Sequence, residues 1–244
     1  MNKYQFDTLD ISAAWQRVTA ASKITMLAHL RPDADSLGAC GALALVLRAH
    51  GKEVEIVYPT STADPLPFAL ENVHAGNHTQ IPDLIISCDA STDERVYTPD
   101  EFAGIDRIII DHHLNNQMSG IYRFVATTAS STCEIVYDLL NAWQQEINTP
   151  IAEILLFGIM CDTLTFRLPN TSPDTLRVAS DLIEKGANLP QLAHGMIMHD
   201  DPAVMQLWGD MLSTIQYTPD KQAIWAVCTQ EMLRTYHLDD TAIC

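Results

Sequence analysis

Basic residues are scarce in this chain of 244 residues. It contains 14 lysines and arginines against 31 aspartates and glutamates, which gives a formal net charge of −17. Proteins that bind along long nucleic acids draw much of their affinity from lysine and arginine side chains that neutralise phosphates. The composition therefore argues against long duplex nucleic acid as a partner. A small phosphorylated substrate stays compatible with it, provided that bound cations reverse the potential at the site.

Long apolar runs and paired cysteine motifs are also missing. The segment MNKYQFDTLDISAAW has no apolar core of the kind found in signal peptides, and no window offers about 20 uninterrupted apolar residues. There is no Cys-x-x-Cys pair, and the cysteines are spread through apolar segments, at Cys40, Cys88, Cys133, Cys161, Cys228 and Cys244. These absences predict reduced thiols and a cytoplasmic protein that is neither exported nor inserted into a membrane.

Apolar and helix-compatible segments alternate in the first half of the chain. Residues 24–30 resemble a buried strand, and about a dozen helix-compatible residues follow and end at Gly51. Residues 54–59, 83–89 and 105–111 repeat the strand pattern. The alternation predicts an α/β fold with a mostly parallel sheet flanked by helices.

The second half of the chain is mainly helical. Helical patterns cover residues 133–146, 150–162 and 172–186, and a further helix at 201–212 precedes two strands around a turn at 218–221.

The organisation predicts two domains. A first domain covers residues 1–188, and a linker covers 189–200. Residues 201–244 form the start of a smaller α/β domain. Residues 201–244 are too few to complete a sheet, so we expect the second domain to be incomplete. Whether residue 244 is the natural C-terminus stays open.

Potential metal ligands follow the first strand. His29, Asp33 and Asp35 lie within seven residues at the carboxyl end of this strand, where open α/β sheets place their active sites. A single aspartate at such a position is more often a helix cap or turn residue. The three together, next to a buried strand, favour a metal site.

Later elements deliver more residues of the same kind to this edge of the sheet. Asp89 ends a second apolar strand, and Asp111, His112 and His113 end a third. Asp162 closes an apolar helix, where its charge runs against the helix dipole and calls for a compensating cation. Mixed imidazole and carboxylate ligands suit Mn²⁺, with Mg²⁺ or Co²⁺ as alternatives. Two such cations about 3.5 to 4 Å apart support phosphoester hydrolysis.

The order of these motifs resembles a known family. HLRPDAD, CDAS, DHH and GIMCDT are similar to the four motifs of the DHH phosphoesterase superfamily and occur in the same order across residues 24–167. The segment ATTASSTCEIVYDLL is most similar to the nanoRNase (oligoribonuclease) and pAp phosphatase branch. The resemblance implies a DHH domain at 1–188 and a partial DHHA1-like domain at 201–244. Family members carry a glycine-rich GGGH-type substrate motif in that second domain, and this sequence has none.

The resemblance also implies a binuclear centre with two Mn²⁺ ions. His29, Asp33 and Asp89 would bind one ion. The other would be bound by Asp35, Asp89, His112 and Asp162, so Asp89 would be the bridge. As catalytic residues, His113 would contact the scissile phosphate and Asp111 would orient a ligating imidazole.

The sequence indicates possible substrate contacts less specifically than metal ligands. Arg31 and Arg167 lie next to motif aspartates, so each either grips phosphate or pairs with a carboxylate. Ser130, Ser131 and Thr132 form a cluster that either contacts phosphate or caps the helix that begins near Cys133.

The resemblance implies a hydrolase that acts through a metal-activated water on 3',5'-bisphosphonucleotides such as pAp and on short single-stranded RNA. Two alternatives use the same metal core: an inorganic pyrophosphatase and a cyclic-dinucleotide phosphodiesterase. A third is a non-catalytic metal-binding module. The oligomeric state stays open and includes a homodimer.

Overall fold

The structure is a computed structural model that describes residues 3–59, 73–75, 77–197 and 201–238. The chain divides into two compact units, Met1–Ala193 and His194–Cys244. The first unit contains every residue predicted for the site.

The first unit is built on a six-stranded sheet in which each neighbouring pair of strands is parallel, with the order β3-β2-β1-β4-β5-β6. Its strands are β1 (Lys23–Leu27), β2 (Glu53–Tyr58), β3 (Val73–Ala75), β4 (Leu84–Cys88), β5 (Arg107–Asp111) and β6 (Tyr122–Val125). The central strands are rich in isoleucine and valine and are almost fully buried, as expected of a parallel sheet covered on both faces. The predicted α/β class with a parallel sheet is confirmed.

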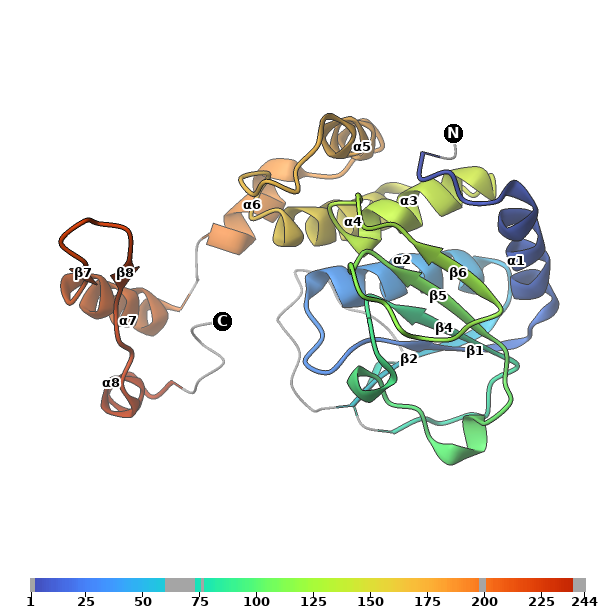
Figure 1. Cartoon of the computed structure of the whole chain (residues 1–244), viewed down its shortest axis with the longest axis horizontal. Coiled ribbons are helices and arrows are strands. Elements are labelled where there is room, and N and C mark those ends of the chain that lie inside the picture. Colours follow the sequence, from blue (N-terminus) through green and yellow to red (C-terminus); the bar gives the residue numbers. More distant parts are fainter. Residues whose placement is uncertain (1–2, 60–72, 76, 198–200, 239–244) are drawn as a thin grey trace. The chain divides into compact units, whose positions relative to one another are not determined.

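Helices cover one face of this sheet (Figure 1). Helix α2 (Ala34–Ala49) packs on β1, β2 and β4, and α3 (Thr132–Ala142) packs on β5. A second layer follows, because α4 (Thr149–Asp162) packs on α2 and α3, and α5 (Pro173–Glu184) packs on α4.

Gly158 permits a close approach of α4 to α2. A Cβ atom there would collide with Cys133 Sγ and lie 3.2 Å from Asp35 Cα. This contact fixes the end of α4, and with it Asp162, relative to the start of α2.

Loops cover the other face of the sheet. Leu27, Val57, Ile85 and Ile109 project there and form an apolar cluster with side chains from the loops that follow β4 and β5. Two short 3₁₀ helices, η1 (Asp93–Arg95) and η2 (Asp100–Phe102), lie in the loop after β4.

Helix α1 (Thr8–Ala20) was not predicted from the sequence. Asp7 caps it by accepting a hydrogen bond from Leu9 N. Trp143 holds it against the end of α3, because the indole donates to Ile11 O at 2.9 Å and the ring stacks on Trp15.

The segment 189–200 is not simply a linker, because it begins with helix α6 (Leu189–Ile197). The side chain of Asn188 accepts a hydrogen bond from Gln191 N, and Pro190 lies in the first turn, where a missing N–H costs little. The boundary between the two units falls within this helix.

The second unit has few described elements. They are α7 (Pro202–Ser213), the antiparallel pair β7 (Gln216–Tyr217) and β8 (Ile224–Trp225), and α8 (Gln230–Thr235). The helix and the two strands around a turn are observed where the sequence places them. Across the described residues, no helix is long and apolar enough to cross a bilayer.

Candidate metal centre

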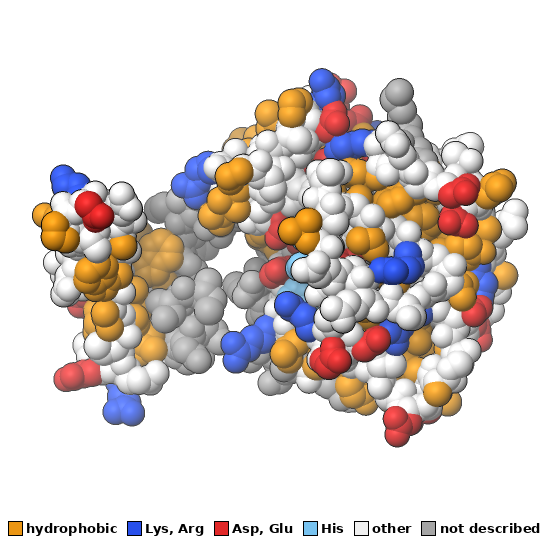
Figure 2. Space-filling model, in the orientation of Figure 1, with side chains coloured by type: hydrophobic (Ala, Val, Ile, Leu, Met, Phe, Trp, Pro, Cys, Tyr) orange, Lys and Arg blue, Asp and Glu red, His pale blue; other side chains and the backbone are white. Residues whose placement is uncertain are grey.

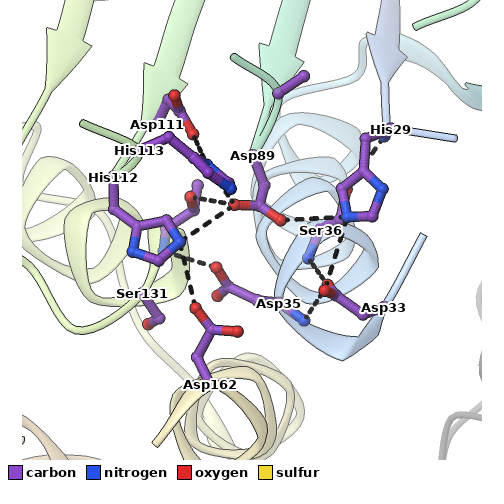
Figure 3. Close-up of polar contacts among 12 residues, drawn as sticks. His29, Asp33, Asp35, Ser36, Asp89, Asp111, His112, His113, Ser131 and Asp162 are labelled. Carbon is purple, nitrogen blue, oxygen red and sulfur yellow. Dashed lines mark hydrogen bonds and ion pairs between the residues drawn. The ribbon is translucent and has the colours of Figure 1, made fainter. Parts of the chain in front are cut away.

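The six predicted metal ligands meet at the carboxyl edge of the sheet (Figure 3). His29, Asp89 and His112 follow β1, β4 and β5, while Asp33 and Asp35 begin α2 and Asp162 ends α4. Three sets of potential ligand atoms each lie within 4.8 Å of one another: His29 with Asp33 and Asp89, Asp35 with His112 and Asp162, and Asp89 with His112 and His113. Segments separated by up to about half of the chain thus converge on one place.

In the first set, His29 faces two carboxylates. Its Nε2 lies 3.3 Å from Asp89 Oδ2 and 3.6 Å from Asp33 Oδ2. Its Nδ1 lies 2.8 Å from the carbonyl oxygen of Leu30, which can only accept, so Nδ1 carries a proton and Nε2 is the atom available to a metal. Burial would lower the pKa of His29, but hydrogen bonds to Asp33 and Asp89 outweigh it and raise the pKa to about 10.

In the second set, His112 Nε2 lies 3.2 Å from Asp162 Oδ2 and 3.5 Å from Asp89 Oδ1. Asp89 therefore faces both sets, with Oδ2 toward His29 and Oδ1 toward His112. This is the arrangement expected of a carboxylate shared by two cations.

In the described part of the chain, the deeper carboxylates of the centre have imidazole partners but no lysine or arginine partner. Burial, together with the neighbouring Asp89 carboxylate, raises the pKa of Asp35. Burial and the carboxylates of Asp35 and Asp89 raise the pKa of Asp162. Among the described residues, no lysine or arginine forms an ion pair with Asp35, Asp89 or Asp162. Crowded acidic groups without a cation are a strong reason to expect one.

The donor set fits two divalent cations. Carboxylate oxygens and neutral imidazole nitrogens are ligands that Mn²⁺ accepts, and Asp89 places one carboxylate oxygen toward each of the first two sets. We therefore assign the two sets as candidate sites for a cation pair.

Asp111 and His113 form a pair beside these sites. His113 Nδ1 lies 2.7 Å from Asp111 Oδ1, and Asn116 Nδ2 donates to Asp111 Oδ2 at 2.7 Å. The hydrogen bond to Asp111 raises the pKa of His113. Burial would raise the pKa of Asp111, but the hydrogen bonds from His113 and Asn116 lower it.

The imidazole that Asp111 contacts is that of His113, and the expected role of Asp111 in orienting a ligating imidazole stays a prediction. His112 faces Asp162 and Asp89 instead. The centroids of the two imidazole rings lie 4.8 Å apart, and His113 Nδ1 also lies 3.7 Å from Asp89 Oδ1.

The predicted substrate contacts lie in different environments. Arg31 is exposed, and Arg167 is exposed with its Nε donating to Leu164 O at 2.8 Å. Ser130 and Ser131 are fully buried at the start of α3. Ser131 accepts a hydrogen bond from Glu134 N, and Ser130 donates to the Glu134 carboxylate. Ser131 thus caps this helix, whereas Ser130 contacts the side chain of Glu134. Contact of either serine with phosphate stays a prediction.

Three further polar residues contact the predicted ligands or their neighbours, and of these only Thr132 was singled out in the sequence, as a phosphate contact or helix cap. Thr132 Oγ1 donates to Asp89 Oδ1 at 3.0 Å. Asn116 Nδ2 donates to Ala90 O at 2.9 Å as well as to Asp111. Asn170 Nδ2 donates to Asp162 O at 3.1 Å and to Ser130 O at 3.0 Å. Because most of these contacts join distant segments, no local spacing in the sequence reveals them.

Left-handed backbone conformations gather around the centre. Five non-glycine residues with φ between 45° and 63° lie in this part of the structure, namely the predicted ligand Asp89 and its neighbours in the site Arg31, Leu164, Thr165 and Phe166. Each such residue costs about 1 to 2 kcal/mol. Such strain concentrates at functional sites, where the surrounding structure holds it in place.

The chain is similar to proteins of known family. Residues 23–159 match the model of the DHH family, N-terminal domain. The chain is 35% identical over 162 residues to the bifunctional oligoribonuclease and PAP phosphatase of Bacillus subtilis, covering 64% of this chain and 51% of that protein. It is 32% identical over 205 residues to the protein of the same name from Thermus thermophilus, covering 80% and 59%. The chain thus spans between half and three fifths of the length of these relatives.

One solved structure shares the fold over nearly the whole chain. It is an exopolyphosphatase-related protein from Bacteroides fragilis, with a TM-score of 0.87 at 22% identity, covering 96% of this chain and 73% of that one. At this identity the likeness establishes the fold alone. The family match covers more than half of the chain, and it includes five of the six predicted ligands. The chain belongs to the DHH family.

Proposed function

We propose that the protein is a phosphoesterase that uses two Mn²⁺ ions to hydrolyse 3',5'-bisphosphonucleotides such as pAp, and short RNA. The observation that carries this proposal is the position of Asp89 between two sets of ligands, with one carboxylate oxygen toward each. His29, Asp33 and Asp89 would hold one ion, and Asp35, Asp89, His112 and Asp162 the other. A cation pair at such a centre activates water and neutralises a phosphoryl oxygen.

His113 is the proposed general acid. Its Nδ1 is bound to Asp111, which leaves Nε2 to hold a proton for the leaving oxygen of the substrate. The side chain is 38% exposed, so a substrate can reach it. Because the bond to Asp111 raises the pKa of His113, the ring stays protonated nearer to neutral pH, as this role requires.

Exposed apolar side chains near the centre support a nucleotide over an inorganic substrate. Leu30 follows His29, and Leu114 follows His113, with 42% and 81% of their surface exposed. Leu164 lies two residues after Asp162 and is 49% exposed. Figure 2 shows hydrophobic, basic and acidic side chains beside an exposed histidine on one face. A nucleobase or ribose can contact such leucines, whereas pyrophosphate has no apolar part.

The names of the relatives support the same class of substrate, because both are described as oligoribonucleases and PAP phosphatases. The net charge of −17 favours the proposal that the substrates are short. Cations neutralise the phosphates near the centre, while further phosphates of a long RNA would lie along an acidic surface.

The test is a substrate panel assayed with the full-length protein after chelation and again after Mn²⁺ is added. The panel contains pAp, a diribonucleotide, pyrophosphate and a cyclic dinucleotide. We expect chelation to abolish hydrolysis of pAp and of the diribonucleotide, and Mn²⁺ to restore it. Hydrolysis that persists in chelator would contradict the metal mechanism. A preference for pyrophosphate or the cyclic dinucleotide would contradict the substrate class, and a metal-loaded protein inert toward the whole panel would favour a non-catalytic module.

A further inference from the structure

The first turn of α3 lies against the two most deeply buried carboxylates of the centre. Asp35 is fully buried, and each of its carboxylate oxygens accepts a backbone hydrogen bond from this turn. Thr132 N donates to Oδ2 at 2.7 Å, and Cys133 N donates to Oδ1 at 2.8 Å. These are two of the N–H groups that a helix start leaves without a partner inside the helix, so Asp35 is held by the backbone itself.

The hydroxyl of Thr132 holds the second carboxylate. Thr132 is fully buried, and its Oγ1 donates to Asp89 Oδ1 at 3.0 Å. The helix start does not need this hydroxyl, because Ser131 is the capping residue and accepts from Glu134 N. The Thr132 side chain is therefore committed to a carboxylate that lies 43 residues away in the sequence.

This contact bears on how Asp89 can be shared. The last torsion of an aspartate side chain is soft, so the carboxylate plane turns easily unless a partner holds it. With the Thr132 hydroxyl on Oδ1, that oxygen stays toward His112 and Oδ2 stays toward His29. The backbone of Asp89 is fixed as well, because its N–H donates to Ile110 O at 3.0 Å.

The loop before α3 is anchored in turn. The buried carboxylate of Glu134 accepts hydrogen bonds from Ser130 N at 3.0 Å and from Thr175 Oγ1 at 3.1 Å, and it pairs with Lys3. Thr132 therefore projects from a rigid support, as a positioning group must.

We propose that Thr132 is a positioning residue that sets the rotation of the Asp89 carboxylate, so that two cations can share it. The inference rests on the proposed metal centre. Thr132→Val keeps the shape of the side chain and removes the donor. Loss of a partner that orients a metal ligand typically lowers metal affinity about 10- to 100-fold. We expect a loss of this size for the more weakly bound Mn²⁺, and Thr132→Ser, which keeps the hydroxyl, should restore binding.

Thr25→Val is the matched control. Thr25 is also fully buried, and its Oγ1 donates to Glu55 Oε1 at 2.9 Å, so this variant removes the same kind of bond from a carboxylate that is no proposed ligand. Its thermal stability should fall while Mn²⁺ binding stays at the level of the unsubstituted protein. Binding is measured from the electron paramagnetic resonance signal of free Mn²⁺, which does not depend on activity.

The outcomes separate this inference from the proposed function. If the unsubstituted protein binds no Mn²⁺, the metal centre and this inference both fail. If it binds two ions and Thr132→Val binds them equally well, the inference alone is overturned. Failure of Thr132→Ser to restore binding would also overturn it. Should Thr132→Val not fold, Thr132→Ala lacks the same donor without a branched side chain and must show the same loss.

Discussion

The two sides of the metal centre differ in how they are held. On the inner side, His29 and Asp89 expose only 6% and 3% of their side chains, and Asp35 is fully buried. On the outer side, Asp33, His112 and Asp162 expose 41%, 19% and 23%. Each carboxylate oxygen of Asp35 and Asp89 faces a backbone N–H of a helix start, a threonine hydroxyl or an imidazole. The outer side chains are more open to water, and of these Asp33 is also held by a helix start, because its Oδ1 accepts hydrogen bonds from Asp35 N and Ser36 N.

Because of this difference, we expect the two sides to contribute differently to cation binding and to the reaction. Inner ligands are fixed before a cation arrives, because the surrounding structure determines their orientation. Outer ligands lie where water and a phosphate can reach them, next to the exposed ring of His113 and the left-handed turn at Leu164, Thr165 and Phe166. Changes on the inner side should therefore act on the cations, and changes on the outer side should act more on the reaction.

We expect the largest loss of bound Mn²⁺ from substitution of Asp89 on the inner side. Asp89→Asn removes a charge that both cations share, whereas Asp33→Asn removes a ligand from one set and lies on the exposed side. Metal analysis of purified variants should therefore find less Mn²⁺ in Asp89→Asn than in Asp33→Asn. Equal metal content in the two variants would mean that Asp89 is not shared.

Substitution of the two adjacent histidines should separate an effect on metal binding from an effect on the reaction rate. His112→Ala should weaken Mn²⁺ binding, because His112 Nε2 lies between Asp89 and Asp162. His113→Ala should keep the metal and lower kcat about 100- to 10,000-fold, the usual contribution of a general acid or base. Metal titration and steady-state kinetics on both variants decide the matter. The reverse pattern would exchange the two roles.

Proton release tests the inner side without a mutation. Hydrogen bonds to Asp33 and Asp89 outweigh the effect of burial and raise the pKa of His29 to about 10, and burial raises the pKa of Asp35 and Asp162. A cation must displace these protons, so Mn²⁺ affinity should rise with pH from about 6 to about 8. Calorimetry in two buffers of different ionisation enthalpy counts the protons, and an affinity independent of pH would contradict the assignment.

The same shifts affect the stability of the metal-free protein. A pKa that is raised on folding stabilises the fold at low pH, and this contribution is lost as pH rises through the folded value. For His29 the window runs from about 6.5, its ordinary value, up to about 10. The metal-free Tm should fall across this range, and added Mn²⁺ should reverse the fall.

Much of this candidate site was predictable because its proposed ligands follow strong local patterns. His29, Asp89 and His112 each end or directly follow a run of apolar residues, and the carboxyl ends of parallel strands meet at one edge. Other features depend on long-range contacts. Thr132 reaches Asp89, and Asn170 reaches Ser130, across 43 and 40 residues, and such pairs leave no spacing to detect.

Some elements of the fold escaped prediction for a related reason. The edge strand β6 and helix α1 alternate polar and apolar residues, and their apolar patterns are weak. Partners elsewhere in the chain hold them in place, β5 for the strand and Trp143 for the helix.

The smallest effect is expected from the leucines of the outer side. Leu114→Ser should raise KM for pAp about three- to ten-fold, because contact with part of one leucine contributes about 1 kcal/mol. Leu9→Ser is the control, since Leu9 is 77% exposed on α1 and Leu114 is 81% exposed. Ribose 3',5'-bisphosphate, which lacks the base, should show a smaller change. An equal rise for both substrates would argue against contact between Leu114 and the base.

The most direct test of the central claim is the number of cations that the unsubstituted protein binds. Equilibrium dialysis against Mn²⁺, with metal and protein measured in the same samples, gives this number without a substrate. We expect two tightly bound ions per chain, and a magnetic resonance spectrum in which they interact, as expected of ions about 3.5 to 4 Å apart. One ion per chain, or two ions whose spectra are independent, would contradict a centre built around a shared Asp89.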